Sequence, residues 1–103
     1  MTDARPVFDL IKDMTLQSME RADLDPRSLM LARLAALVAV EAPPASYVAN
    51  LAAAGDAGLT LDDVQALLIA VSPIVGTPRV VTAVGNIARG LGTDIQPMDG
   101  NFA

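Results

Sequence analysis

Prolines and glycines break this sequence into segments of helical length, and the residues between the breaks limit the chain to a helical fold. Apolar residues recur within the segments at the spacing of an α-helix. Val64, Leu67, Leu68 and Val71, for example, stand at i, i+3, i+4 and i+7. The alternation of apolar and polar residues that marks a strand never persists. The sequence therefore predicts an all-α protein, a compact bundle of about five to six helices without a sheet.

Residues that cap or stop helices place the boundaries of five of these helices. Asp25, Thr60 and Thr77 precede apolar runs and can accept a hydrogen bond from a backbone N–H of the first turn, as N-caps do. Proline cannot donate to a helical ladder, so Pro43-Pro44 and Ser72-Pro73 are expected to mark the ends of the helices before them. The predicted helices cover residues 6–21, 26–41, 45–57, 61–72 and 78–91.

The predicted helix 26–41 is apolar nearly all round, since only Arg27 and Arg33 interrupt its Leu, Ala and Val residues. Such a helix is buried, so this one should form the centre of the bundle. The residues expected to point inward from the helix 45–57 are Tyr47, Val48 and Leu51.

At 103 residues, the chain has the length of one domain. Hydrophobic residues make up 52% of it, which is enough for a compact core. We expect a single helical domain over 1–103 with its core in 24–91. Residues 93–103 hold Pro, Gly, Asn and Asp without any period and are expected to form a tail.

Missing residue types exclude most catalytic chemistry. The chain has no Cys, which rules out a disulfide, a thiolate nucleophile, an iron–sulfur cluster and a thiolate zinc site. It also has no His, the usual general base and the commonest metal ligand. We therefore expect neither a metal nor a cofactor.

The charges argue against nucleic acid and membranes as partners. The net charge is −5, and the Lys and Arg residues are scattered, whereas a surface that follows phosphates needs clustered cations. An anionic membrane would repel the chain for the same reason. The first residues include Asp3, Arg5 and Asp9 instead of the apolar core of a signal peptide, and the uncharged runs 42–55 and 64–78 are too short to span a bilayer. These features predict a cytoplasmic protein.

Two short motifs frame the central helices. Residues 24–27, Leu-Asp-Pro-Arg, lead into the apolar helix, and residues 73–79, Pro-Ile-Val-Gly-Thr-Pro-Arg, follow the fourth helix. Between them a short helix closes at Ala57-Gly58. Over residues 24–91 this order resembles the carboxymuconolactone decarboxylase family, which includes the alkylhydroperoxidase D-like proteins. The resemblance implies an all-α fold and rings of three or six subunits.

In the redox branch of that family, a Cys-x-x-Cys-x-x-x-His motif on the third helix and a Glu on the preceding helix carry the reaction. Counted back from the shared Ala-Gly, the two Cys places fall on Pro43 and Ser46, the His place on Asn50 and the Glu place on Leu31. Pro43 and Leu31 carry no reactive atom, and a serine without a base is a poor nucleophile. The resemblance therefore implies the fold without thiol peroxidase chemistry.

Four residues remain as candidates for a site between the second and third helices, namely Glu41, Ser46, Tyr47 and Asn50. Ser46 and Asn50 lie four residues apart, on one helical face. Glu41 ends an apolar helix, where a carboxylate could act as an acid or a base. The alternative is structural, with Glu41 solvated at a helix end, Ser46 as a cap, Asn50 as a hydrogen-bonding filler and Tyr47 as a packing residue.

Two arginines are further candidates. Arg33 lies midway along the most apolar helix, where a guanidinium must find a partner or reach the surface. We expect an ion pair with Asp62, Asp63 or another subunit, and anion binding is the alternative. Arg79, at the start of the fifth helix, either favours an anion beside the helix N-terminus or is a solvated or interface residue.

Three functions fit these observations. The first is a non-redox homo-oligomer that binds a small molecule, such as an organic acid or a lactone, or is purely structural. The second is a decarboxylase or lactone-processing enzyme that uses groups other than Cys. The third is a module that assembles with a catalytically competent relative. The absence of thiols and imidazoles favours the first and third. The excess of apolar surface on the second, fourth and fifth helices predicts a homo-oligomer, and the family resemblance implies that it is a trimer or a hexamer.

Overall fold

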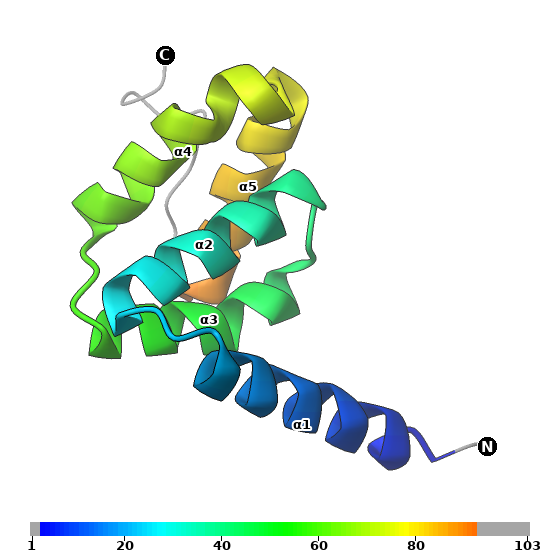
Figure 1. Cartoon of the computed structure of the whole chain (residues 1–103). Coiled ribbons are helices and arrows are strands. Elements are labelled where there is room, and N and C mark those ends of the chain that lie inside the picture. The colour runs from blue at the N-terminus through cyan, green and yellow to red at the C-terminus, as the bar shows by residue number, and fades with distance from the viewer. Residues whose placement is uncertain (1–2, 93–103) are drawn as a thin grey trace.

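The computed structural model describes residues 3–92, and this part of the chain forms five helices and no strand (Figure 1). The helices are α1 (Arg5–Arg21), α2 (Pro26–Ala39), α3 (Pro44–Asp56), α4 (Leu61–Val75) and α5 (Thr77–Gly90). The predicted all-α class is confirmed, and each expected helix is present. The predicted tail, 93–103, lies outside the described residues.

Helix α2 forms the centre of the fold, as its sequence predicts. It packs against α3, α4 and α5, and Figure 1 shows it between α3 and α4 with α5 close by. Its buried residues, Met30, Leu34 and Val38, recur every four positions and so lie along one side of the helix. Leu34 and Val38 are fully buried, so the core is built around this stripe.

Helix α3 packs on α2 and α5 through one narrow stripe of buried residues, Tyr47, Leu51 and Ala54. The prediction that Tyr47 and Leu51 point inward is confirmed. The same prediction for Val48 is wrong, because its side chain is 54% exposed. Val48 follows Tyr47 by one residue and therefore lies about 100° further round the helix, outside the narrow stripe that the core covers.

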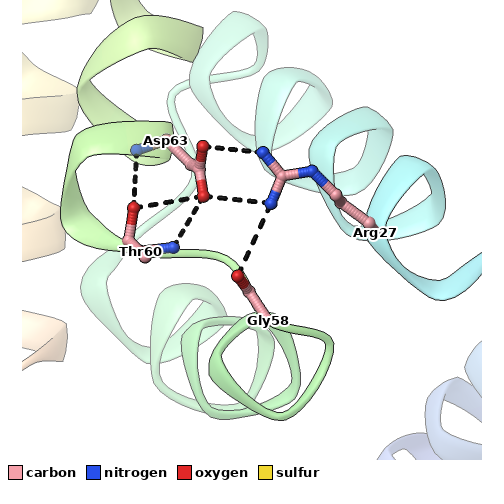
Figure 2. A network of polar contacts seen from close by, with 4 residues as sticks. All are labelled: Arg27, Gly58, Thr60 and Asp63. Carbon is pink, nitrogen blue, oxygen red and sulfur yellow. Dashed lines mark hydrogen bonds and ion pairs between the residues drawn. The ribbon is translucent and has the colours of Figure 1, made fainter.

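Side chains cap the starts of α2 and α4, as predicted. The Oδ2 of Asp25 accepts a hydrogen bond of 3.0 Å from the backbone N–H of Ser28. Thr60 and Asp63 form a capping box, in which the Asp63 N–H donates to Thr60 Oγ1 over 3.2 Å and the Thr60 N–H donates to Asp63 Oδ2 over 2.8 Å (Figure 2). Local hydrogen bonds thus fix where these two helices begin.

Helix α2 ends at Ala39, before the double proline and before the predicted end at residue 41. The backbone turns there, since the Ala42 N–H donates to the Leu37 carbonyl over 3.0 Å and Glu41 takes a left-handed φ of +56°. This reversal ends the helix before Pro43 is reached, so the prolines mark the start of α3 instead. Pro43 is its N-cap and Pro44 its first residue.

The sequence predicted that α4 ends at Ser72-Pro73. This prediction is wrong, because the helix continues through Pro73 to Val75. Pro73 has a φ compatible with a helix, and the lack of its N–H removes one hydrogen bond of the last turns without ending the helix there. The residue that ends the helix is Gly76, whose φ of +91° breaks the helical path. Gly76 is also the N-cap of α5, so the prediction that Thr77 caps that helix is wrong, and Thr77 is its first residue.

Helix α1 stands apart from the other four. None of its residues is buried, and Figure 1 shows it projecting away from the rest of the described chain. Only Thr15 and Met19 are partly buried. Its exposed large apolar side chains are Val7, Phe8, Leu10, Ile11, Met14 and Leu16.

No single helix within residues 3–92 is both long and apolar enough to cross a membrane. Helices α3 and α4 together reach the required length and hydropathy, but the chain bends by 120° between them.

Candidate functional site

The polar groups between α2 and α3 form a short chain of hydrogen bonds. Arg33, on α2, donates from Nε to the Oδ1 of Asn50, on α3, over 3.0 Å. The Nδ2 of Asn50 donates to the backbone carbonyl of Ser46 over 2.7 Å. All three residues are half-buried. The amide of Asn50 is therefore held at both ends, and in turn it holds the guanidinium in place.

A small pocket of about 220 Å³ opens beside this contact and is lined by Arg33, Ala36, Leu37 and Asn50. Its walls combine one guanidinium and one amide with aliphatic carbon. Within residues 3–92, Arg33 has no carboxylate within ion-pairing distance, and its Nη groups make no hydrogen bond. The pocket thus contains a half-buried positive charge without a counterion from the described chain.

The predicted ion pair of Arg33 with Asp62 or Asp63 is not formed. Asp63 is instead bound by Arg27, which lies nearly two turns before Arg33 on the central helix and donates two hydrogen bonds, from Nη2 to Oδ1 over 2.7 Å and from Nη1 to Oδ2 over 3.0 Å. Helix α4 runs alongside the start of α2 at that point, whereas Arg33 faces α3. Pairing of Arg33 with another subunit stays a prediction.

Glu41 is not brought to the pocket. Its Oε1 lies 3.6 Å from the Nε of Arg79, on α5, and both side chains are about half exposed, at 50% and 53%. Arg79 also donates from Nη1 to the carbonyl of Ala39 over 3.2 Å, at the end of α2. The two residues form a solvated ion pair that joins α2 to α5, so Glu41 lacks the apolar surroundings expected of a general base.

Tyr47 lies in the core and not in the pocket. Its side chain is completely buried, and its hydroxyl has no hydrogen-bond partner among residues 3–92. Burial raises the pKa of this phenol, because the charged phenolate would be poorly solvated there. Of the four candidates, the structure therefore brings together Ser46 and Asn50, through the amide-to-carbonyl bond, and separates them from Glu41 and Tyr47.

A second, larger hollow lies between α4 and α5 and has a volume of about 390 Å³. We call it the α4–α5 groove. Its lining is aliphatic except for two uncharged polar residues, Gln65 and Ser72. The lining residues are Leu61, Val64, Gln65, Leu68, Ile69, Ser72, Val80, Val84, Ile87, Ala88 and Leu91. The apolar spacing along α4 and α5 predicted helices but no hollow between them.

The model of the carboxymuconolactone decarboxylase family matches residues 5–88, which include all of α1 to α4 and most of α5. The chain belongs to the carboxymuconolactone decarboxylase family. No curated protein and no solved structure matches it significantly. The family assignment predicted from the motifs is confirmed, and the match begins before residue 24, at residue 5, and so includes α1.

In this carboxymuconolactone decarboxylase family member, the places of the redox motif lie along the first turns of α3. Pro43 is the N-cap of α3, and the Ser46 N–H donates to the Pro43 carbonyl over 3.0 Å, so no side chain caps this helix. Asn50, in the His place, contacts Arg33 instead of a thiol. No cluster of side chains suited to a metal ion occurs among the described residues.

Arg33 has a larger part in this site than its sequence position indicated. It was treated as a charge in need of an acidic partner, whereas its partner is the amide of Asn50. The available signal was its isolation, since it is the sole charged residue between Arg27 and Glu41 on the most apolar helix. That isolation indicates a guanidinium facing a specific polar group, because an unpaired charge on a packed helix is costly.

Proposed function

We propose that this family member is a non-redox, homo-oligomeric protein that binds a small organic acid in the pocket between α2 and α3. The observation that supports the proposal is the half-buried guanidinium of Arg33, which is positioned by Asn50 and lacks a carboxylate partner in the described chain. A cation in such a place gains more from a bound carboxylate than an exposed arginine does, because less water competes for its donors.

The geometry of the pocket suits a carboxylate attached to a small apolar group. The Nε of Arg33 is occupied by Asn50, which leaves the Nη groups as donors for the planar carboxylate. Ala36 and Leu37 supply an apolar wall for the carbon skeleton of the ligand. A volume of about 220 Å³ is at the low end for a ligand site, which favours a compact acid.

Binding, and not turnover, is the function that the residue types support. The chain has neither thiol nor imidazole, and Glu41, the acid-base candidate nearest in sequence, is paired with Arg79 away from the pocket. The decarboxylase or lactone-processing alternative lacks a positioned acid or base in the described part of the chain. No contact favours the third alternative, a module for a catalytically competent relative.

Thermal-shift and calorimetric titrations with benzoate and butyrate test this function, with benzamide as the neutral analogue of benzoate. We expect a carboxylate to raise the melting temperature in a dose-dependent way, and benzamide to leave it unchanged. Arg33→Gln should remove the effect. The control is Arg21→Gln, which alters an exposed arginine of α1 and should retain it. Equal shifts in both variants, or no shift with either acid, would refute the proposal.

The homo-oligomer is supported by large apolar side chains on the surface of the single chain. Ile69 and Ile74, on α4, and Val81, on α5, are 67%, 85% and 54% exposed. Together with α1, they give more apolar surface than isolated soluble domains leave in contact with water. We expect a trimer or a hexamer. Light scattering at low micromolar concentration should report at least a dimer, and a stable monomer would contradict the proposal.

A further inference from the structure

Helix α1 carries an uncovered apolar stripe. Val7, Leu10, Ile11 and Met14 follow the i, i+3, i+4, i+7 spacing and so share one side of the helix, and each is more than half exposed. The nearby charged residues, Asp9, Lys12 and Asp13, lie on the other side of the helix. An amphipathic helix of this kind is stable in water only when a second apolar surface covers its stripe.

The α4–α5 groove offers a surface of matching chemistry. Its lining contains no charged residue, so an apolar helix face could enter it without burying an unpaired charge. Along α4 the lining runs from Leu61 to Ser72, and along α5 from Val80 to Leu91. Each run is about 16 Å long at 1.5 Å per residue, and the stripe from Val7 to Met14 is about 11 Å long. The groove can therefore accept the whole stripe.

The helix α1 of the same chain does not occupy this groove. Its last turns sit at the opposite side of the core, where Met19 lines a hollow with residues of α2 and α3, among them Met30 and Ala53. From there α1 extends away from the bundle (Figure 1). The stripe therefore lies away from the groove of its own chain, and within residues 3–92 neither surface is covered by the other.

We propose that the α1 stripe of one copy packs into the α4–α5 groove of a second copy. The inference rests on the homo-oligomer of the proposed function and adds its interface. Each chain supplies one stripe and one groove, so a closed ring or a reciprocal pair fills every groove and covers every stripe without a further component. The family match includes α1 as well as α4 and most of α5, so both halves belong to the family domain.

Engineered cysteines test the contact cleanly, because the chain has none of its own. Ile11→Cys and Ile69→Cys chains of different mass are mixed and mildly oxidised. We expect the disulfide between these two chains to form at least about tenfold faster than the disulfide between Ile11→Cys and Val48→Cys chains. The reason is that a bound helix raises the effective concentration of one thiol near the other. Val48 lies on the exposed side of α3, so it serves as the control. Equal rates, or a dominant Ile11→Cys homodimer, would overturn the proposal.

A charge placed in the stripe gives an independent test that does not depend on disulfide geometry. Ile11→Asp should lower the oligomeric mass in light scattering, whereas Leu16→Asp, the same kind of change on the other side of α1, should not. Neither residue is buried, so both variants should fold. If light scattering finds an oligomer but Ile11→Asp leaves it intact, the interface is wrong and the oligomer stands. A monomeric parent protein would refute both.

Discussion

Arg27 holds both carboxylate oxygens of Asp63, with distances of 2.7 Å from Nη2 to Oδ1 and 3.0 Å from Nη1 to Oδ2 (Figure 2). The same carboxylate accepts the backbone N–H of Thr60 over 2.8 Å. One side chain therefore connects the first turn of α2 to the first turn of α4. These hydrogen bonds, with that from Arg27 the largest cause, hold the pKa of Asp63 far below its usual range.

The lowered pKa of Asp63 predicts a loss of stability at acid pH. The folded protein keeps this carboxylate ionised at pH values where the unfolded chain, with an ordinary pKa of about 4, already takes up a proton. The stabilisation is thus complete above that pH and decreases as the pH falls toward the folded pKa. The melting temperature of the parent should exceed that of Asp63→Asn most near neutral pH, with the gap closing below pH 4 or so.

The neighbouring residue provides the control for this titration. Asp62 is exposed and makes no ion pair or hydrogen bond within residues 3–92, so Asp62→Asn should leave the pH profile unchanged. A gap between parent and Asp63→Asn that stays constant at acid pH would contradict the assigned role.

The cap of α4 predicts a measurable difference between two threonines. Thr60→Ala removes the side-chain oxygen that accepts the Asp63 N–H and should lower the free energy of unfolding by about 1 kcal/mol. Thr77→Ala changes an exposed residue that makes no cap bond, because Gly76 is the N-cap of α5, and should have little effect. Urea denaturation of both variants measures this difference. Equal losses of unfolding free energy in the two variants would show that the hydrogen bond to Thr60 Oγ1 does not stabilise the protein.

Two glycines of α5 should respond in opposite directions to alanine. A Cβ at Gly90 would lie 3.1 Å from the Cβ of Tyr47 and 3.3 Å from the Cδ1 of Leu51, whereas a Cβ at Gly85 would meet nothing within 4 Å. Gly90→Ala should therefore destabilise the protein by about 1–2 kcal/mol through overpacking. Gly85→Ala should stabilise it by about 0.5–1 kcal/mol through helix propensity. A stabilised Gly90→Ala variant would mean that α3 and α5 can move apart freely.

The hydroxyl of Tyr47 is buried and has no hydrogen-bond partner among the described residues, so it should not stabilise the fold. Tyr47→Phe should leave the free energy of unfolding unchanged or raise it slightly, whereas Tyr47→Ala should lower it by about 3–5 kcal/mol. Tyr47 is the only tyrosine, so its ultraviolet titration is easy to follow. Because burial raises the pKa of Tyr47, the folded protein should titrate at a higher pH than an exposed tyrosine does. A marked loss of stability in Tyr47→Phe would reveal a hydrogen bond to this group.

The purified protein should not reduce peroxides or disulfides. The thiol route to both reactions, which the redox branch of the family uses, needs cysteine, and the chain contains no Cys and no His. Peroxide consumption above the buffer rate, in a preparation free of metal and of other proteins, would contradict this expectation.

The sequence predicted the helices well where local hydrogen bonds decide their ends. Asp25 and Thr60 act within a few residues of themselves, so their caps follow from the sequence alone. Gly76 was not predicted as the end of α4, because proline usually disrupts a helix and Pro73 comes three residues earlier, whereas it is the positive φ of Gly76 that ends the helix.

The candidate site was predicted less completely, because its contacts depend on how the helices are rotated against one another. Arg33 and Asn50 lie 17 positions apart and meet only because the two helices turn these faces together. Glu41 was expected near Asn50, but the left-handed turn after α2 directs it toward α5. Periodicity identifies the buried side of a helix, and it does not say which neighbouring helix covers each residue.

Gly76 ends α4 and begins α5, so one residue is the entire connection between them. Because the connection is this short, the two helices cannot move independently at this end. The angle between them is set mainly by the φ and ψ of Gly76. Any change in the width of the α4–α5 groove must therefore come from rotation at that joint or from bending of the helices. The two walls of the groove are thus hinged at Gly76, which is far along the chain from α1, the helix proposed to enter the groove.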